Sequence, residues 1–373
     1  MPLNERFTAL DVFRGMTICF MIIVNTPGDW NTTFSPLHHA QWHGFTPTDL
    51  VFPSFLFAVG NAMSFVMLSW AAKSNGYVVG KILKRTFLIF LLGYLMYWYP
   101  FFDVNEAGEW VMRPISNTRI MGVLQRIALC YGIAALMIHF LKIRTATIIT
   151  GVFLVGYWLL LYFLGEDGQE FTMTGNVGYK IDLWVLGESH LYNGEGVPFD
   201  PEGLLGTLPA VGNVVIGFLV GKFLQEKGKT YEALTKLMVA GFTLLIAAYF
   251  WNLVFPINKK LWTSSFVLHT SGLDCLILAT IIYVIDFLHK TRWTNFFEIV
   301  GRNPLFIYLL SEVLAITLYA IHVGETSAYQ WIYQTIFSHA GPYIGSLLFA
   351  LTVMLICWLA GYWLDKKRIY VRV

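Results

Sequence analysis

The stretch LLFALTVMLICWLAGYWL, residues 347–364, decides the fold class of this chain because it contains no charged residue. Residues 204–221, LLGTLPAVGNVVIGFLVG, show the same pattern. A helix that crosses a hydrocarbon core of roughly 30 Å needs about 20 predominantly apolar residues. The composition extends this argument to all 373 residues, of which 56% are hydrophobic and 13% are charged. The sequence therefore predicts an integral membrane protein.

Further apolar segments predict an all-α polytopic bundle of about ten transmembrane helices, because a bilayer offers unpaired backbone groups no hydrogen-bond partner. Residues 1–373 are interpreted as a single transmembrane domain. Gly217 and Gly221 form a GxxxG motif that allows close helix packing within the bundle. The predicted crossings are residues 12–27, 47–71, 83–101, 119–141, 145–164, 203–224, 234–254, 263–288, 304–322 and 342–364.

The distribution of Lys and Arg predicts the orientation of the bundle. An even number of crossings puts both termini on one side, and most of the 25 basic residues lie on that side, which the positive-inside rule makes cytoplasmic. The remaining basic residues lie on the extracytoplasmic side or inside the predicted crossings, and they are Arg113, Arg119, Arg126, Lys180, Lys259 and Lys260. The predicted extracytoplasmic segments are residues 38–53, 102–118, 165–202 and 256–262. A formal net charge of +2 with no basic tail argues against a nucleic-acid partner.

Residues 38–53, HHAQWHGFTPTDLVFP, concentrate groups that can exchange protons. Asp49 ends a helix-start pattern, so its carboxylate can cap the second helix, orient a nearby imidazole, or do both. A histidine near the membrane surface suits a general base at neutral pH, although each histidine can also be a surface or packing residue. His38, His39 and His43 have no acid or cysteine at the spacing of a zinc site, and no metal is predicted.

Ionisable and polar groups inside the crossings are costly to insert, so they are functional candidates, with pairing inside the bundle as the alternative. They are Asp11, Arg14, Arg119, Gln125, Arg126, Asp274 and Glu312. The 165–202 loop combines several acids with Gly, Tyr, Trp and Asn. This mixture suits a sugar-like or cationic ligand, and the alternative is a solvated loop.

Seven short motifs give the chain a resemblance to a known family. They are LDVFRG at 10–15, VN at 24–25, HAQWHG at 39–44, DLVFP at 49–53, GVLQR at 122–126, DPEGLLGT at 200–207 and NKKLW at 258–262. In this order they resemble the transmembrane heparan-α-glucosaminide N-acetyltransferase family and its bacterial relatives. The resemblance implies one acyltransferase domain that moves an acetyl group from cytoplasmic acetyl-CoA to an extracytoplasmic, glucosamine-like amino sugar.

The same resemblance implies where the enzyme and its catalytic base lie. The His-Ala-x-Trp-x-Gly pattern places the catalytic histidine of the family at His39. The chain begins without the long lumenal segment of the animal lysosomal enzymes, so a multi-pass protein of a bacterial inner membrane is expected. Membrane lipids surround such a protein, and the oligomeric state stays open between a monomer and a homodimer.

Acetyl-CoA and the base then start on opposite faces, so the site must be a tunnel through the bundle. His39 is expected to take a proton from the attacking amine, or alternatively to accept the acetyl group first. Asp49 would orient His39, and Asn25 or Asn258 would hold the developing oxyanion. The expected acetyl-CoA contacts are Arg14, Lys84, Arg85 and Arg126, and the expected acceptor contacts are Trp42, Arg119, Asp200, Glu202 and Trp262. The alternative from another class is a permease for amino sugars or N-acetylglucosamine.

Overall fold

The computed structural model describes residues 7–104 and 109–371. The helices are α1 (Thr8–Asn25), α2 (Val51–Trp70), α3 (Asn75–Trp98), α4 (Val123–Phe140), α5 (Ile143–Leu164), α6 (Val177–Val185), α7 (Thr207–Lys227), α8 (Tyr231–Asn252), α9 (Ser264–Ile282), α10 (Thr294–Arg302), α11 (Pro304–Ala320), α12 (Ala328–Ile332) and α13 (Pro342–Lys366). Two small antiparallel hairpins join β1 (Phe102–Val104) to β2 (Trp110–Met112) and β3 (His322–Val323) to β4 (Thr326–Ser327). The all-α prediction is confirmed.

Each predicted crossing corresponds to a long helix: α1, α2, α3, α4, α5, α7, α8, α9, α11 and α13. Within the described ranges, eight helices are long and apolar enough to span a membrane by themselves. Helix α11 has 17 residues and follows α10 across a bend of 83°, and this pair makes a ninth possible span. Helix α3 has 24 residues but begins at Asn75, so its first half contains the basic residues Lys81, Lys84 and Arg85.

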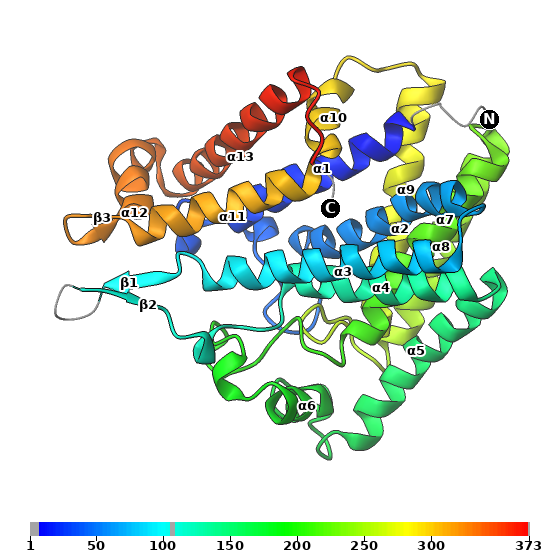
Figure 1. Ribbon diagram of the computed structural model, residues 1–373, viewed down its shortest axis with the longest axis horizontal. Helices are drawn as coiled ribbons and strands as arrows, with labels where there is room; N and C mark the ends of the chain where they lie inside the picture. Colours follow the sequence, from blue (N-terminus) through cyan, green and yellow to red (C-terminus); the bar gives the residue numbers. More distant parts are fainter. Residues whose placement is uncertain (1–6, 105–108, 372–373) are drawn as a thin grey trace.

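The close packing of α2 against α7 explains the glycines of the sixth crossing. A methyl group on Gly217 would lie 2.1 Å from the carbonyl oxygen of Phe57, and one on Gly60 would lie 1.9 Å from that of Val214. Only glycine lets the two backbones approach this closely. The predicted role of the GxxxG motif within the bundle is therefore confirmed. Figure 1 shows α1, α2, α3, α11 and α13 running in similar directions, with α9 crossing them.

The predicted extracytoplasmic segments meet at one end of the bundle. The Trp42 indole donates to the carbonyl oxygen of Phe171 at 2.8 Å, and Lys260 pairs with Glu195 at 2.5 Å. The predicted cytoplasmic segments meet elsewhere, where Lys229 pairs with Asp286 at 2.7 Å and lies over the ring of Phe7. Alternation of the loops between two faces is what successive crossings of a membrane require.

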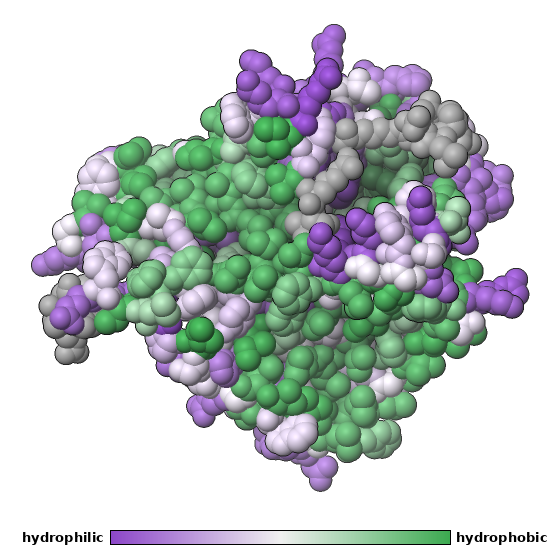
Figure 2. Space-filling view, viewed as in Figure 1, coloured by the Kyte–Doolittle hydropathy of each residue, from purple (hydrophilic) through white to green (hydrophobic). Residues whose placement is uncertain are grey.

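The surface agrees with a membrane environment. Figure 2 shows a broad apolar face over the middle of the molecule, with hydrophilic side chains gathered toward its edges. Large apolar side chains lie exposed on the lipid-facing helices, among them Phe163 on α5 and Phe242 on α8. Exposure of this kind is unfavourable in water but ordinary for a helix that faces lipid.

Two sequence-based expectations need correction. Arg119 lies before α4 rather than within it, because α4 begins at Val123 and Arg119 instead pairs with residues near 200. The 165–202 segment is not a simple solvated loop, because it contains α6 and buries Asp182 and Asp200. These carboxylates are buried because each accepts hydrogen bonds from neighbouring groups, Asp182 from the Leu204 amide and Asp200 from Arg119.

Candidate active site

A compact loop between α1 and α2 carries the three histidines. Short 3-10 turns at Trp30–Thr32, Ser35–Leu37 and Pro47–Leu50 fold this loop back on itself. The hydroxyl of Thr46 donates to the carbonyl oxygen of His38 at 2.7 Å, and that of Thr48 donates to Pro36 at 3.0 Å. The loop therefore holds its own shape and presents His39 in a fixed position.

His39 and Asp49 form the central pair of the site. The Nδ1 atom of His39 lies 2.7 Å from Oδ1 of Asp49, while Oδ2 accepts from the amides of Thr46 at 2.9 Å and Ala40 at 3.1 Å. Asp49 thus caps the helix start with one oxygen and orients the imidazole with the other, so both predicted roles coexist. An ionised carboxylate can only accept, so Nδ1 carries the proton and Nε2 keeps its lone pair.

The burial of the pair is uneven in a way that suits a base. Asp49 is fully buried, whereas the His39 side chain is 40% exposed. Burial lowers the pKa of His39 below its ordinary value near 6.5, and the nearby Lys259 ammonium lowers it further. Asp49 opposes this shift without reversing it. His39 is therefore neutral at neutral pH and can accept a proton at Nε2.

Lys259 is the residue that the sequence analysis did not assign. Its Nζ atom lies 3.0 Å from Nε2 and 3.2 Å from Nδ1 of His39. A signal was present, because Lys259 is one of the few basic residues on the predicted extracytoplasmic side and belongs to the NKKLW motif. Nothing in the sequence indicated which histidine it would contact.

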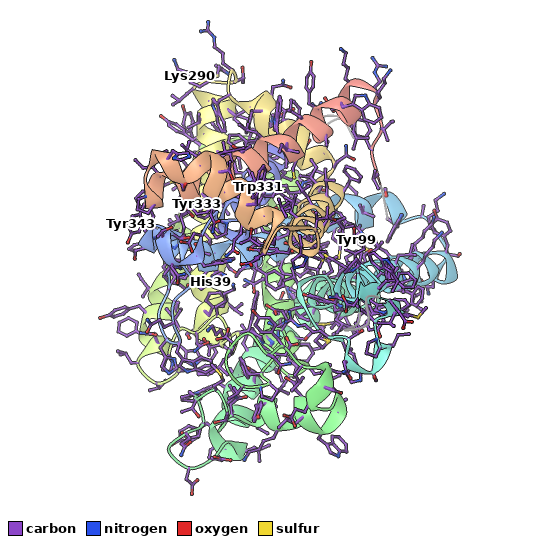
Figure 3. All side chains as sticks on the ribbon, turned by 90° about the vertical axis from the view of Figure 1, so that its left-hand side faces the viewer. His39, Tyr99, Lys290, Trp331, Tyr333 and Tyr343 are labelled. Carbon is purple, nitrogen blue, oxygen red and sulfur yellow. The ribbon has the colours of Figure 1, made fainter. Side chains whose placement is uncertain are left out.

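The other two histidines make separate contacts. His38 Nε2 lies 3.1 Å from the carbonyl oxygen of Thr33, and His43 Nδ1 lies 3.3 Å from Nδ2 of Asn258. Across the described residues there is no group of His, Cys, Asp or Glu side chains that could hold a metal ion. In Figure 3, His39 lies well apart from Lys290, which follows α9 in the loop on the predicted cytoplasmic side.

The two candidate oxyanion donors have other hydrogen-bond partners. Asn25, the last residue of α1, donates through Nδ2 to Glu312 on α11 at 3.2 Å. Asn258 accepts the Leu261 amide through Oδ1 at 2.8 Å, which closes the turn that contains Lys259. Asn258 therefore shapes the loop, and Asn25 couples the end of α1 to the half-buried carboxyl of Glu312.

A second charged cluster lies beside the His39 pair. Arg119 donates to both oxygens of Asp200, at 2.7 and 2.9 Å, and to Glu202 at 2.6 Å. Its guanidinium lies between the rings of Tyr97 and Tyr192, with centroids at 4.9 and 4.7 Å. Burial tends to raise the pKa of Glu202, but Arg119, Arg126 and Lys259 outweigh it and hold that pKa below its usual value. The structure thus brings together three of the predicted acceptor contacts.

A cavity of about 480 Å³ opens next to this cluster. Arg119, Tyr97 and Tyr192 line it together with polar side chains such as Asn117 and Asn193. Aromatic rings with short polar groups are the chemistry expected around a sugar. This cavity therefore gives the Arg119 cluster access to a ligand from the extracytoplasmic side.

Trp42, Trp262 and Arg126 have different surroundings from one another. Trp42 is half-buried and joins the His39 loop to the 165–202 segment. Trp262 is fully buried, and its indole donates to Asn213 on α7 at 3.1 Å. Arg126 is stacked over Trp262 at 4.9 Å and donates to the carbonyl oxygen of Gly203 at 2.9 Å. Trp262 and Arg126 therefore lie together in the core near the extracytoplasmic end.

Two adjoining cavities lie toward the predicted cytoplasmic end. One of about 430 Å³ lies between α1 and α2, and a smaller one of about 80 Å³ reaches α3, α4 and α11. Arg14, Ala58 and Ala62 line both cavities, and Arg85 lines the smaller one. Lys84 is exposed and lines neither. The structure therefore brings Arg14 and Arg85 together and leaves Lys84 apart, and Arg126 lines neither cavity.

The deep acids of the bundle do not pair with each other. Asp274 accepts from the Ser54 hydroxyl at 2.5 Å, and Glu312 accepts from Asn25. Arg14 pairs with Asp11 one turn earlier on α1. The alternative of mutual pairing therefore holds for Asp11 and Arg14, whereas Asp274 and Glu312 have neutral partners.

Comparison with known proteins points to one family. The family described as heparan-alpha-glucosaminide N-acetyltransferase, catalytic, matches residues 6–248. The chain is 29% identical to heparan-alpha-glucosaminide N-acetyltransferase of Homo sapiens over 371 residues, covering 83% of this chain and 53% of the human protein. It is also 29% identical to the Mus musculus protein of the same name over 366 residues, covering 83% and 54%. The chain thus spans about half the length of the curated relatives it matches.

Proposed function

The chain belongs to the heparan-α-glucosaminide N-acetyltransferase family, and on this premise we propose that it transfers an acetyl group across a membrane. The donor is cytoplasmic acetyl-CoA, and the acceptor is the amine of an extracytoplasmic, glucosamine-like amino sugar. We place the protein in a bacterial inner membrane, with His39 as the general base. The observation that carries the proposal is the 2.7 Å contact between His39 Nδ1 and Asp49, which leaves Nε2 free to accept a proton.

The cavities at the cytoplasmic end support acetyl-CoA as the donor. Coenzyme A is a polyanion, and two arginines, Arg14 and Arg85, line these cavities. Among the described residues, Arg14 Nε, Arg85 Nε and the Asn61 side-chain oxygen are buried without a hydrogen-bond partner. Buried polar atoms are normally satisfied, so these unpartnered atoms, with Asn61 at the larger cavity, Arg85 at the smaller and Arg14 at both, favour a polar ligand across the two cavities. The residues present therefore fit a phosphate-bearing donor.

The extracytoplasmic groups support an amine acceptor. In the proposed reaction the amine nitrogen attacks the carbonyl carbon of the thioester, a C–N bond forms and the C–S bond breaks. His39 takes the proton that the amine loses, and the leaving CoA thiolate then takes that proton from His39. Asp49 holds the imidazole in the required tautomer throughout. Asn25 and Asn258 stay proposed donors to the developing oxyanion, since each side-chain amide has two N–H groups.

The acceptor site is proposed at the cavity beside Arg119. Asp200, whose side chain is fully buried, would hold Arg119 in place, Glu202 would accept a hydrogen bond from a sugar hydroxyl or amine group, and Trp42 would offer an aromatic face. The Trp262 side chain is fully buried, so it does not contact the acceptor directly. It instead holds the loop that contains Lys259. Arg126 likewise acts from the core and not as a direct contact to CoA.

The proposal is tested by acetyl transfer to glucosamine in purified protein. His39→Gln should lower kcat by about 10²- to 10⁴-fold, the usual contribution of general acid–base catalysis. His38→Gln is the matched control, because His38 is adjacent but contacts the Thr33 backbone instead, and it should stay within a few-fold of the parent. Comparable activity in the parent and in His39→Gln would show that His39 is not the base.

A second measurement separates direct transfer from an acetyl-histidine intermediate. Rapid quench with radiolabelled acetyl-CoA and no acceptor should leave the protein unlabelled if the amine attacks the thioester directly. Stable label on the parent that is absent from His39→Gln would favour the two-step route. Uptake of labelled sugar into liposomes without acetyl-CoA would instead indicate a permease.

A further inference from the structure

The position of the Lys259 ammonium on His39 is unusual for a simple surface lysine. Its Nζ atom is nearly equidistant from the two ring nitrogens, at 3.0 and 3.2 Å. A point in the ring plane at these distances would overlap the carbon between the nitrogens, so the ammonium lies against the face of the imidazole. The lone pair of Nε2, which lies in the ring plane, therefore stays accessible to a substrate proton.

Lys259 has hydrogen-bonding capacity left over in this position. An ammonium has three N–H donors and no acceptor. Within residues 7–104 and 109–371, the ring nitrogens of His39 are the atoms at hydrogen-bond distance from its ammonium, and it forms no ion pair. Burial lowers the pKa of Lys259, and the nearby Glu202 and Asp49 carboxylates act to raise it and so favour the charged ammonium. At least one N–H can therefore reach a substrate atom that lies beside His39.

The turn around Lys259 is anchored on both sides. The amides of Leu261 and Trp262 donate to the Asn258 side chain at 2.8 Å and to the Lys259 carbonyl oxygen at 3.0 Å. The neighbouring Lys260 pairs with Glu195 at 2.5 Å. Trp262 adopts a positive φ of 55° and has no exposed surface, and it packs edge-on against Phe52 with ring centroids 4.8 Å apart. A lysine on such a turn is held in place with little further loss of entropy on binding.

We propose that Lys259 is a catalytic residue of the acetyl transfer, whose ammonium donates a hydrogen bond to the thioester carbonyl oxygen as negative charge develops there. The inference rests on the proposed function. When the amine attacks, the carbonyl π electrons move onto that oxygen, and they return as the C–S bond breaks. A fixed cation in a partly dehydrated site stabilises this oxygen more than the ground-state carbonyl. The amine proton still passes to Nε2 of His39.

The charge of Lys259 also acts on the base itself. After burial, it is the largest influence that lowers the pKa of His39, whereas Asp49 and Glu202 act to raise it. Removing the ammonium should therefore move the titration of His39 to higher pH. This titration therefore tests whether the ammonium lies against His39, and the loss of kcat tests its catalytic role.

The test compares Lys259→Met and Lys259→Arg with Lys260→Met in the full-length protein. Lys259→Met should lower kcat by about 10²- to 10³-fold, as expected for loss of one oxyanion donor, with a smaller change in the KM for glucosamine. Lys259→Arg keeps a cation and should recover part of the loss. Lys260→Met, the neighbouring control, loses the pair with Glu195 but keeps the ammonium beside His39, so its kcat should fall far less than that of Lys259→Met.

The titration of His39, followed by NMR of ring-labelled histidine without substrate, is the second readout. It should move to higher pH in Lys259→Met and stay in place in Lys260→Met. If the parent is active and Lys259→Met has the same kcat, the inference about Lys259 is overturned and the proposed function is not. Equal losses in Lys259→Met and Lys260→Met without a shift in titration would also overturn it. A parent that transfers no acetyl group to any amine would overturn the proposed function, and this inference with it.

Discussion

The extracytoplasmic site and the cytoplasmic cavities satisfy their polar groups in opposite ways. At His39, the imidazole lies within hydrogen-bond distance of the Asp49 carboxylate, at 2.7 Å, and of the Lys259 ammonium, at 3.0 and 3.2 Å. Around the cytoplasmic cavities, Arg14 Nε and Arg85 Nε are buried and have no hydrogen-bond partner among the described residues. The first arrangement is typical of preorganised catalytic groups, and the second of a surface that binds a charged ligand.

This difference predicts two kinds of mutational effect. Groups around His39 should act on the chemical step and so on kcat. Groups around the cavities should act on donor binding and so on the KM for acetyl-CoA. A substitution near His39 that changed only the KM for acetyl-CoA, or a substitution at the cavities that changed only kcat, would contradict this distinction.

The largest effect is expected at Asp49. Asp49→Asn leaves one acceptor oxygen where the structure uses two, for the backbone amides and for His39, so the tautomer is no longer fixed and kcat should fall by about 10²- to 10⁴-fold, in the range of acid–base catalysis. Acetyl-CoA affinity, measured by calorimetry, should be unchanged. Thr48→Val is the control, since Thr48 supports the same loop through Pro36 without contacting His39. Equal losses in both variants would mean that Asp49 acts only on the shape of the loop.

The next effect is expected at the smaller cytoplasmic cavity. Arg85→Ala should raise the KM for acetyl-CoA by about 10- to 100-fold, the loss of one hydrogen bond to a charged group, with kcat little changed. Lys84→Ala is the matched control, because Lys84 is the preceding residue of α3 but is exposed and lines neither cavity. Steady-state kinetics at varied acetyl-CoA would measure both. Equal effects at the two positions would argue against the cavity as the donor site.

A smaller effect is expected from pH. Because the pKa of His39 is held below 6.5, the base stays neutral and active as the pH falls to that value. At pH 6, a base with an ordinary pKa of 6.5 would keep about a quarter of its activity, so the parent should keep more than that. The acid limb of kcat/KM measures this pKa. A midpoint above 6.5 would contradict the conclusion that burial and the Lys259 ammonium lower the pKa of His39.

The smallest effect is expected at Trp42. Trp42→Phe keeps an aromatic ring but loses the hydrogen bond to Phe171, so the His39 loop is tied less firmly to the 165–202 segment. A neutral hydrogen bond contributes about 1 kcal/mol, which predicts an increase of roughly fivefold in the KM for the acceptor. The KM for acetyl-CoA should not change. A change in the KM for acetyl-CoA alone would contradict the assignment of Trp42 to the acceptor site.

Much of the architecture could be predicted because membrane crossings depend on local composition. Ten apolar segments gave ten long helices, and the Lys and Arg distribution placed the segments containing His39, Phe171 and Glu195 on one face, where they meet. His39 and Asp49 were predicted from residue type and from family resemblance. The start of α4 was missed because Arg119 finds its partners about 80 residues later, which no local pattern can report.

The amino-acid sequence by itself determined where the long apolar helices lie and which histidine belongs to the family motif. Only the tertiary structure decided that Lys259 lies on His39, that Arg85 and not Lys84 lines a cavity, and that Asp49 serves both the helix and the imidazole. The physical reason is that hydrophobicity acts along the chain, residue by residue. Hydrogen bonds and charges act over a few ångströms between residues that only the packed helices bring together.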